Sequence, residues 1–265
     1  MMLKDKVAVI HGGGGAIGGA AARAFAREGA RVYLAGRTRE RLEAVARDIH
    51  AAGGRAEVAV VDALDAPAVQ RHADDVIAAG GRIDIALNAV GFVHVQGPGF
   101  EELPLADFMH PVEAYARTNF ITAHAAVRGM IAQRSGVILT LSTPGARMTG
   151  RGFLGNGVAS AAVEAFSRLL AGELGELGIR VVCLRPHAIP EAVAHSHTRE
   201  VFAPMAAGAG LDIEAMLARH AESGTLLKRL PTLSEVADVA AFVASDRAGA
   251  MTGAIMNLSC GALVD

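Results

Sequence analysis

Short, unbroken apolar runs alternate with longer stretches of helical periodicity along almost the whole chain. The apolar runs are rich in Val, Ile and Leu, which is typical of strands buried on both faces of a sheet. Strands are predicted at residues 7–10, 31–35, 57–61, 83–89, 136–141, 180–184 and 254–258. Helices are predicted at residues 17–28, 39–52, 66–79, 112–133, 158–177, 213–221 and 233–244. This alternation predicts an α/β fold in which a seven-stranded parallel sheet is covered by helices on both faces.

Two segments interrupt the alternation. Residues 91–111 are loop-like, with Gly and Pro clustered at their start. Residues 187–230 are irregular apart from the helix at 213–221, and their stretch 202–211 is uncharged and rich in Ala, Gly and Met. Such a segment suits a mobile lid over an apolar ligand, although a surface insertion would have the same composition. Because no linker, charge block or repeat divides residues 1–265, we predict a single doubly wound domain with a variable lid region at about 187–230.

Composition narrows the classes of function. The 265 residues include 25 basic and 27 acidic side chains, and this balance argues against a nucleic-acid or membrane-surface binder. No apolar run approaches the roughly 20 residues that a bilayer span needs, and the start of the chain does not resemble a signal peptide. Two cysteines, Cys183 and Cys260, provide neither a disulfide framework nor a metal cluster. We therefore expect a cytoplasmic protein that acts on a small molecule, without a nucleic-acid, membrane or metal partner.

A glycine-rich turn follows the first predicted strand. The sequence His-Gly-Gly-Gly-Gly-Ala-Ile-Gly occupies residues 11–18, between a buried strand and a helix. A pyrophosphate needs backbone N–H groups at close range and the positive end of a helix dipole, and glycine permits both the tight turn and the close approach. This position favours a dinucleotide-binding loop over an ordinary turn. Cofactor contacts are expected at Gly12, Gly14, Gly15, Ile17 and Gly18.

The end of the second predicted strand distinguishes the two nicotinamide cofactors. A carboxylate there would hold the ribose hydroxyls of NAD, whereas this chain has Arg37 and no acidic residue. Because a guanidinium pairs well with a phosphate, Arg37 predicts NADP in preference to NAD; the alternative is a solvated arginine at a helix start. Asp62 and Ala63 follow the third strand as further candidates. Asp62 would either accept a hydrogen bond from the adenine amino group or serve as a turn residue.

With these motifs in order, the chain resembles the short-chain dehydrogenase/reductase family over about residues 4–262. The matching positions are Gly12, Gly18, Asn88, Ala89, Asn119, residues 178–181, Pro186, residues 251–253 and Gly261. His11 and Ala16 depart from the family's first motif. The resemblance implies a Rossmann fold and hydride transfer between a nicotinamide and a carbonyl or alcohol carbon. It also implies cofactor contacts at Asn88, Ala89, Pro186 and Ile189, a proton relay supported by Asn119, and a homodimer or homotetramer.

The family's proton-transfer residues are replaced in this chain. In the family, a Ser after the fifth strand binds the substrate oxygen, a Tyr transfers the proton, and a Lys one helical turn later lowers the Tyr pKa. The Ser position is Thr143, or Ser142 if the register slips by one; the Tyr position is Asn156, and the Lys position is Ser160. A looser spacing would put Phe153 at the Tyr position and still supply no Lys. Asn156 can hydrogen-bond a carbonyl but does not readily give up a proton.

Three functions therefore stay open. With only two tyrosines, Tyr33 and Tyr115, and no lysine between residues 7 and 227, no shift of register restores the Tyr and Lys pair. The first function is an NADP-dependent oxidoreductase for a carbonyl, enone or alcohol of a small apolar substrate. His94 and His187 are the candidate proton donors, because an imidazole titrates near neutrality; the alternative is that each is an ordinary loop histidine. The second is a nucleotide-binding sensor or partner subunit without turnover, and the third is a lyase or isomerase on the same fold.

Two further patterns have ordinary as well as functional explanations. His195 and His197 have the spacing of a metal-ligand pair, but without a third ligand nearby we expect solvated loop histidines. The predicted helix at 158–177 begins with several alanines, whose small side chains allow close packing. Its neighbour would be either a second copy of the chain or the core of its own.

Overall fold

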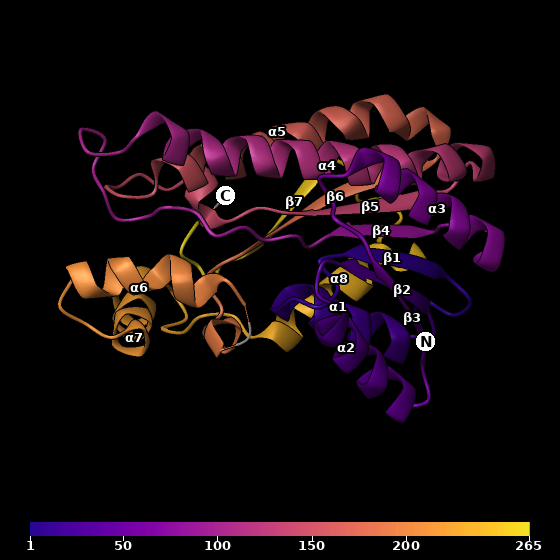
Figure 1. Ribbon diagram of the computed structural model, residues 1–265, viewed down its shortest axis with the longest axis horizontal. Coiled ribbons are helices and arrows are strands. Elements are labelled where there is room, and N and C mark those ends of the chain that lie inside the picture. The colour runs from indigo at the N-terminus through magenta and orange to yellow at the C-terminus, as the bar shows by residue number, and fades with distance from the viewer. Residues whose placement is uncertain (195, 265) are drawn as a thin grey trace.

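Seven parallel strands form one sheet in the computed structural model, which describes residues 1–194 and 196–264 (Figure 1). The strands are β1 (Val7–His11), β2 (Arg31–Gly36), β3 (Arg55–Val60), β4 (Ile85–Asn88), β5 (Gly136–Leu141), β6 (Ile179–Pro186) and β7 (Ala254–Leu258). Their order in the sheet is β3-β2-β1-β4-β5-β6-β7. The chain thus builds the sheet outward from β1 in two directions, and folds of this kind bind ligands where the direction reverses, at the C-terminal ends of β1 and β4.

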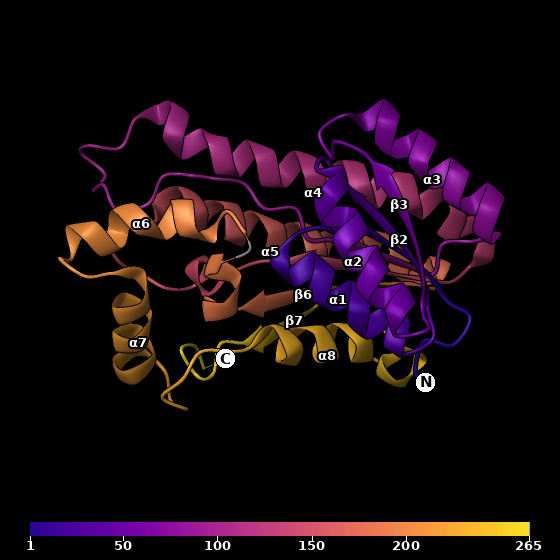
Figure 2. The same ribbon diagram turned by 60° about the horizontal axis from the view of Figure 1, so that its bottom comes forward.

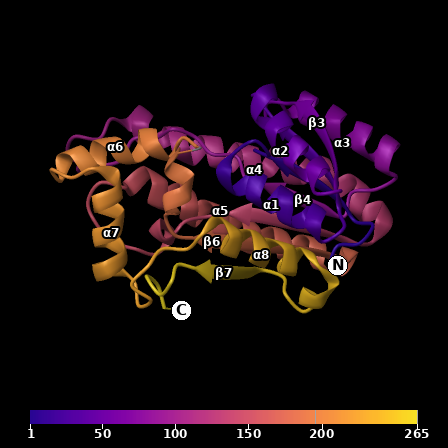
Figure 3. The same ribbon diagram turned by 90° about the horizontal axis from the view of Figure 1, so that it is seen from below.

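Helices cover both faces of the sheet. One face carries α1 (Ala16–Arg27), α2 (Arg39–Ala51) and α8 (Leu233–Ala244), and the other carries α3 (Ala66–Gly80), α4 (Leu105–Gln133) and α5 (Leu154–Leu174) (Figures 1 and 3). Successive residues of β1 contribute to opposite cores: Ile10 packs in the first and Val9 in the second. The inner strands β1, β4 and β5 are buried along nearly their whole length, which is why their sequences are nearly continuous apolar runs rather than alternating ones.

Two further helices stand beyond the C-terminal ends of the strands. They are α6 (Thr198–Gly208) and α7 (Ile213–Gly224) (Figure 2). The two helices share a small apolar core that includes Val193, Leu217 and Leu230. No single described helix is long and apolar enough to cross a membrane; α6 and α7 meet that criterion only together, as a pair bent by 79°. This pair lies where the sequence predicts a lid.

The structure confirms the predicted fold and corrects it in two places. The bounds of β5, β7 and α8 are as predicted. However, α4 begins at Leu105 and continues through the buried Pro111, within a segment predicted to be loop. Residues 198–208 form α6 although they were predicted to be irregular, and this helix contains Pro204. Proline interrupts helical hydrogen bonding, so both helices depend on tertiary packing that periodicity does not report.

Candidate active site

A cleft of about 230 Å³ opens at the C-terminal end of β1. It is lined by His11, Gly12, Gly14, Gly15, Ile17, Arg37, Arg41, Asp62, Ala63 and Ala89, among others. Most of the expected cofactor residues thus lie together around one cleft. Gly18 and Asn88 lie beneath it: Gly18 packs against the backbone of Gly12, and buried Asn88 accepts a hydrogen bond from the amide of Val90 at 3.0 Å.

Close backbone packing explains why the turn after β1 is made of glycine. Gly12 has a positive φ of 78°, and a Cβ there would lie 2.4 Å from the carbonyl oxygen of Ala89. A Cβ on Gly18 would lie 2.2 Å from the carbonyl oxygen of Gly12. Gly15 is the N-cap of α1 and offers no side chain to satisfy the first amides of that helix. These amides and the positive end of the helix dipole fit a pyrophosphate.

The far end of the cleft is cationic. Exposed Arg37 follows β2, and Arg41 lies on the same wall, one turn into α2. Asp62 also lines this end, and its Oδ1 accepts a hydrogen bond from the amide of Leu64 at 3.0 Å. Arg41 is not among the cleft residues predicted from the sequence. A second arginine four residues after Arg37, at the start of a helix, is the pattern that indicates it.

His11 occupies the end of β1 as a buried, uncharged imidazole. Its ring meets His72 of α3 edge-on, with 6.0 Å between centroids, and neither ring nitrogen has a hydrogen-bond partner among the described residues. Burial, with a smaller effect of His72, lowers the pKa of His11 to about 3. His11, which departs from the first motif of the resembling family, is thus a group that is neutral at physiological pH.

A second cavity, of about 370 Å³, continues from this cleft. Ile17, Ala89, Gly91 and His197 are among the residues that line both spaces. The ring of His197 lies over Gly91, where a Cβ would be only 2.1 Å from a ring carbon. Pro186 and Ile189, expected at the cofactor, line this second cavity. A ligand there would therefore lie next to the inner end of a nucleotide bound in the cleft.

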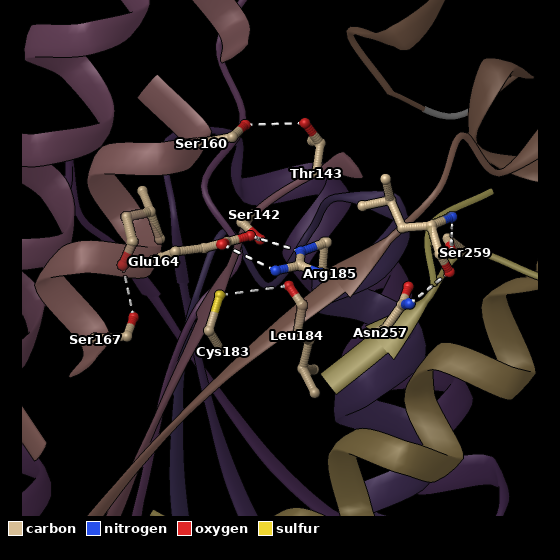
Figure 4. Close-up of polar contacts among 12 residues, drawn as sticks. Ser142, Thr143, Ser160, Glu164, Ser167, Cys183, Leu184, Arg185, Asn257 and Ser259 are labelled. Carbon is tan, nitrogen blue, oxygen red and sulfur yellow. Dashed lines mark hydrogen bonds and ion pairs between the residues drawn. The ribbon is translucent and has the colours of Figure 1, made fainter. Parts of the chain in front are cut away.

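The residues predicted to stand at the family's Ser, Tyr and Lys positions all line this second cavity. The hydroxyl of Thr143 lies 2.9 Å from the hydroxyl of Ser160 (Figure 4). Asn156 Nδ2 donates to Thr143 Oγ1 at 3.4 Å. Ser142 also lines the cavity, but its hydroxyl donates to Glu164 at 2.9 Å. Thr143, rather than Ser142, therefore joins the polar group that faces a ligand.

A buried ion pair lies under this polar group. Glu164 of α5 accepts two hydrogen bonds from Arg185 of β6, at 2.6 and 2.9 Å, in addition to the one from Ser142 (Figure 4). Both charged side chains are almost fully buried. Such a bidentate pair is strong and directional, and it ties α5, β5 and β6 together directly beneath Thr143.

Asn119 of α4 is held near the cavity but does not line it. Its Nδ2 donates to the backbone carbonyl of Tyr115 at 2.9 Å, and its buried Oδ1 has no partner among the described residues. An unpaired acceptor of this kind suits an ordered water. Tyr115, one helical turn earlier, does line the cavity.

Four histidines line the same cavity, and burial keeps all of them neutral. Burial lowers the pKa of His187 and of His197 to about 4, with smaller effects of His220 and His94 respectively. The pKa values of His94 and His220 are also lowered, chiefly by burial. Thus none of the four is cationic near neutral pH.

The hydrogen bonds of His187 and His220 join α7 to the end of β6. His187 Nδ1 accepts from the amide of Ala188 at 2.6 Å, so its proton is on Nε2. That nitrogen lies 2.9 Å from Nε2 of His220, on α7. His187 is a candidate that the sequence predicts. His220 is not, because its place within an ordinary amphipathic helix does not distinguish it.

The cavity is otherwise apolar. Among its described lining residues, Met148, Phe153, Phe202, Met205 and Met216 are large and apolar, and none is Asp, Glu, Lys or Arg. No group of three described His, Cys, Asp or Glu side chains could hold a metal ion. His195, one of the two histidines considered as a metal pair, lies outside the described residues. The arrangement thus combines neutral hydrogen-bonding groups with an apolar wall.

Comparisons with known proteins agree with this architecture. The family described as "Enoyl-(Acyl carrier protein) reductase" matches residues 14–262. An uncharacterized oxidoreductase of Mycobacterium tuberculosis is 34% identical over 98% of this chain and 92% of its own. Sorbitol-6-phosphate 2-dehydrogenase of Klebsiella pneumoniae is 29% identical over 98% of this chain and 96% of its own.

Solved structures are similar over nearly the whole chain. A short-chain type dehydrogenase/reductase from Mycobacterium marinum has a TM-score of 0.82 at 26% identity, covering 99% of this chain and 97% of its own. NAD⁺-bound xylitol dehydrogenase has a TM-score of 0.89 at 24% identity, covering 98% and 100%, a likeness of fold alone. The chain belongs to the short-chain dehydrogenase/reductase family of oxidoreductases, whose members bind NAD or NADP.

Proposed function

We propose that this protein is an NADP(H)-dependent oxidoreductase that interconverts a neutral, apolar ketone or enone with its reduced form. The observation that carries this proposal is the continuity of a glycine-lined cleft with an apolar cavity whose polar groups converge at Thr143 and Asn156. Family membership supplies the type of reaction. The residues of this chain supply the choice of cofactor and the class of substrate.

The cofactor proposal rests on the two ends of the cleft. The turn at Gly12–Gly15 and the first amides of α1 would hold the pyrophosphate, and Arg37 would pair with the 2′-phosphate, with Arg41 beside it. When bound, NADPH supplies a hydride and NADP⁺ accepts one. No acidic residue of β2 or its end faces the cleft to favour the ribose hydroxyls of NAD.

The substrate oxygen would be held by Thr143 and Asn156. If Ser160 donates its proton to Thr143, the Thr143 hydroxyl donates its own to the substrate. The second N–H of Asn156 Nδ2 is a further donor. Two such donors polarise a carbonyl and stabilise the negative charge that develops on its oxygen, and they are most effective where water is excluded.

The cavity favours an uncharged substrate. A buried phosphate or ammonium group needs an opposite charge, and no described residue that lines this cavity supplies one. The relative from Klebsiella pneumoniae is named for a phosphorylated sugar. The wall of Met, Phe and Leu side chains here suits a hydrophobic carbon skeleton instead. His187 and His220 would close this cavity on the lid side as neutral groups.

Nucleotide binding and turnover test the proposal separately. Nicotinamide fluorescence should show that NADPH binds more tightly than NADH, and NADPH should be consumed with at least one member of a panel of neutral ketones and enones. Thr143→Val should lower turnover by about 10²-fold, the usual effect of losing one donor at a developing oxyanion, with NADPH affinity unchanged. NADPH binding without turnover of any panel member would favour a sensor or partner subunit. Chemical change of a substrate without net NADPH consumption would favour a lyase or isomerase.

We also propose that the chain assembles as a homodimer or homotetramer. Phe120 of α4 and Leu169 of α5 expose 59% and 72% of their surface, and these two helices pack side by side. Exposed apolar groups on adjacent helices are typical of an interface. Light scattering should give the mass of two or four chains, and Leu169→Glu should reduce it. A monomeric wild-type protein would contradict this proposal.

A further inference from the structure

The proposed reduction needs a proton for the substrate oxygen, and the imidazoles in the cavity are poorly suited to supply it. Gln96 Nε2 donates to His94 Nε2 at 2.8 Å, which leaves the His94 proton on Nδ1, 2.8 Å from the carbonyl oxygen of Phe92. Both nitrogens of His94 are thereby engaged. The proton of His187 points to His220 in the same way.

Loss of a proton from a neutral imidazole is also energetically unfavourable. An imidazole is a useful acid only as the cation, and burial lowers the pKa of His187 and His197 to about 4. At neutral pH only about one molecule in a thousand would carry that cation, since each pH unit changes the ratio tenfold. A donor that is fully protonated at neutral pH has a clear advantage.

Tyr115 is such a group, and it lines the same cavity as Thr143 and Asn156. Burial raises the pKa of its phenol, so the hydroxyl keeps its proton at neutral pH. The hydroxyl oxygen lies 3.4 Å from the amide nitrogen of Phe92, which donates to it. No acceptor for the phenolic proton is found among the described residues, which leaves it for a ligand.

Neighbouring rings fix the direction of this phenol. The ring of Tyr115 makes edge-on contacts with Phe92 and His94, with centroid distances of 5.4 and 6.4 Å. His94 is itself locked by Phe92 and Gln96. A ring held on two sides presents its hydroxyl without the loss of freedom that a loose side chain would suffer.

We propose that Tyr115, from α4, is the catalytic proton donor, replacing from a different helix the phenol that α5 lacks. The proposal rests on the proposed function. Hydride addition to the carbonyl carbon moves the π pair of the C=O bond onto the oxygen, and that oxygen takes the Tyr115 proton. The products are an alcohol, NADP⁺ and a phenolate, which faces the Phe92 amide and regains a proton from water.

The test is Tyr115→Phe, which keeps the ring and its packing. Ketone reduction should fall by about 10²-fold or more, the usual effect of losing a general acid, with KM and NADPH affinity nearly unchanged. The matched control is Tyr33→Phe: Tyr33 lies in β2, and its buried hydroxyl has no partner among the described residues. This control should keep full activity. Wild-type turnover with an equally active Tyr115→Phe would overturn the role of Tyr115 but leave the proposed function standing. Failure of the wild type to bind NADPH or reduce any ketone would overturn both.

A spectroscopic measurement does not depend on turnover. The chain has two tyrosines and no tryptophan, so in Tyr33→Phe the ionisation of Tyr115 alone can be followed by its near-ultraviolet absorbance. A neutral cyclic ketone such as cyclohexanone, added at saturation to the NADP⁺ complex, would accept a hydrogen bond from the protonated phenol. Because this stabilises the protonated form, the pKa of Tyr115 should rise. An unchanged titration with the ketone bound would overturn the proposal.

Discussion

The hydroxyl of Thr143 lies 2.9 Å from that of Ser160, and Asn156 donates to the same threonine. The three side chains predicted to stand at the family's Ser, Tyr and Lys positions therefore lie within one hydrogen-bonded group. In the double variant Asn156→Tyr and Ser160→Lys, the phenol and the ammonium would enter this cavity together. We expect turnover to rise by about tenfold or more over wild type, within the range of general acid–base effects.

Steady-state NADPH consumption with the best ketone checks this expectation. Ser160→Lys alone should not raise the rate, because it brings an ammonium without a phenol to act on. In the double variant, Tyr115→Phe should cost much less than in the wild type, since two donors then serve one oxygen. A folded double variant that is slower than wild type would show that the backbone at these positions no longer supports the usual chemistry.

Arg37 should set the preference between cofactors. Replacing Arg37 with Ala should raise the Kd for NADPH by about tenfold, the lower end of what a charge-assisted hydrogen bond contributes, because the side chain is exposed. The Kd for NADH should change by less than about twofold, since NADH has no 2′-phosphate. Fluorescence titration with both nucleotides measures this. Arg39→Ala is the matched control, because Arg39 pairs with Glu43 and is not among the residues that line the cleft. Equal losses for both nucleotides would contradict the assignment.

His11 should make the protein sensitive to acid. Its pKa is about 3 in the folded state and about 6.5 in an unfolded chain, so between these values only the unfolded chain takes up the proton. The free energy of unfolding therefore falls as the pH decreases through this window, by up to about 1.4 kcal/mol per unit from this residue. In His11→Thr this contribution is absent. Urea unfolding across the window should give a shallower slope for the variant, and the slopes should coincide above about pH 7. Parallel slopes throughout would rule out the buried neutral state of His11.

Glu164 should contribute strongly to the free energy of unfolding, although it does not line the cavity. Glu164→Gln would remove the carboxylate that binds the buried Arg185 guanidinium, and removal of one partner of a buried ion pair costs about 3–5 kcal/mol. Urea unfolding at neutral pH measures this. Glu173→Gln, on an exposed position of the same helix, should cost less than about 0.5 kcal/mol. A loss below about 1 kcal/mol for Glu164→Gln would show that the pair is weak or replaced by water.

Much of the fold follows from local sequence, because strands buried on both faces need continuous apolar runs. The exact bounds of β5, which is buried along nearly its whole length, illustrate this. By contrast, α6 contains Pro204 and a glycine-rich end, and it is held by contacts with α7 and residues near Val193. Periodicity cannot report a helix whose stability comes from such distant contacts.

The sequence predicts those site residues whose position follows from their spacing after a strand. It does not predict those whose side-chain direction depends on the path of a loop. The glycine turn and Arg37 could be located by their position after strands. The choice between Thr143 and Ser142 needed the direction of each hydroxyl, which depends on buried Glu164. Tyr115 lies within the helix predicted at 112–133, but nothing in the sequence indicates that its side chain faces the cavity. The spacing of four residues between Tyr115 and Asn119 places both on one face of the helix. That Tyr115 reaches the cavity depends on the loop before α4, whose Phe92 amide contacts the Tyr115 hydroxyl.

The buried ion pair of Glu164 and Arg185 does not include the two residues that replace the usual proton-transfer pair. It links α5, β6 and the end of β5 beneath Thr143, and neither Asn156 nor Ser160 takes part in its hydrogen bonds. We therefore expect the backbone of these elements to keep its conformation when the side chains at positions 156 and 160 are replaced. Such independence makes this chain a natural scaffold for installing new reactions by substitution rather than by redesign of the backbone.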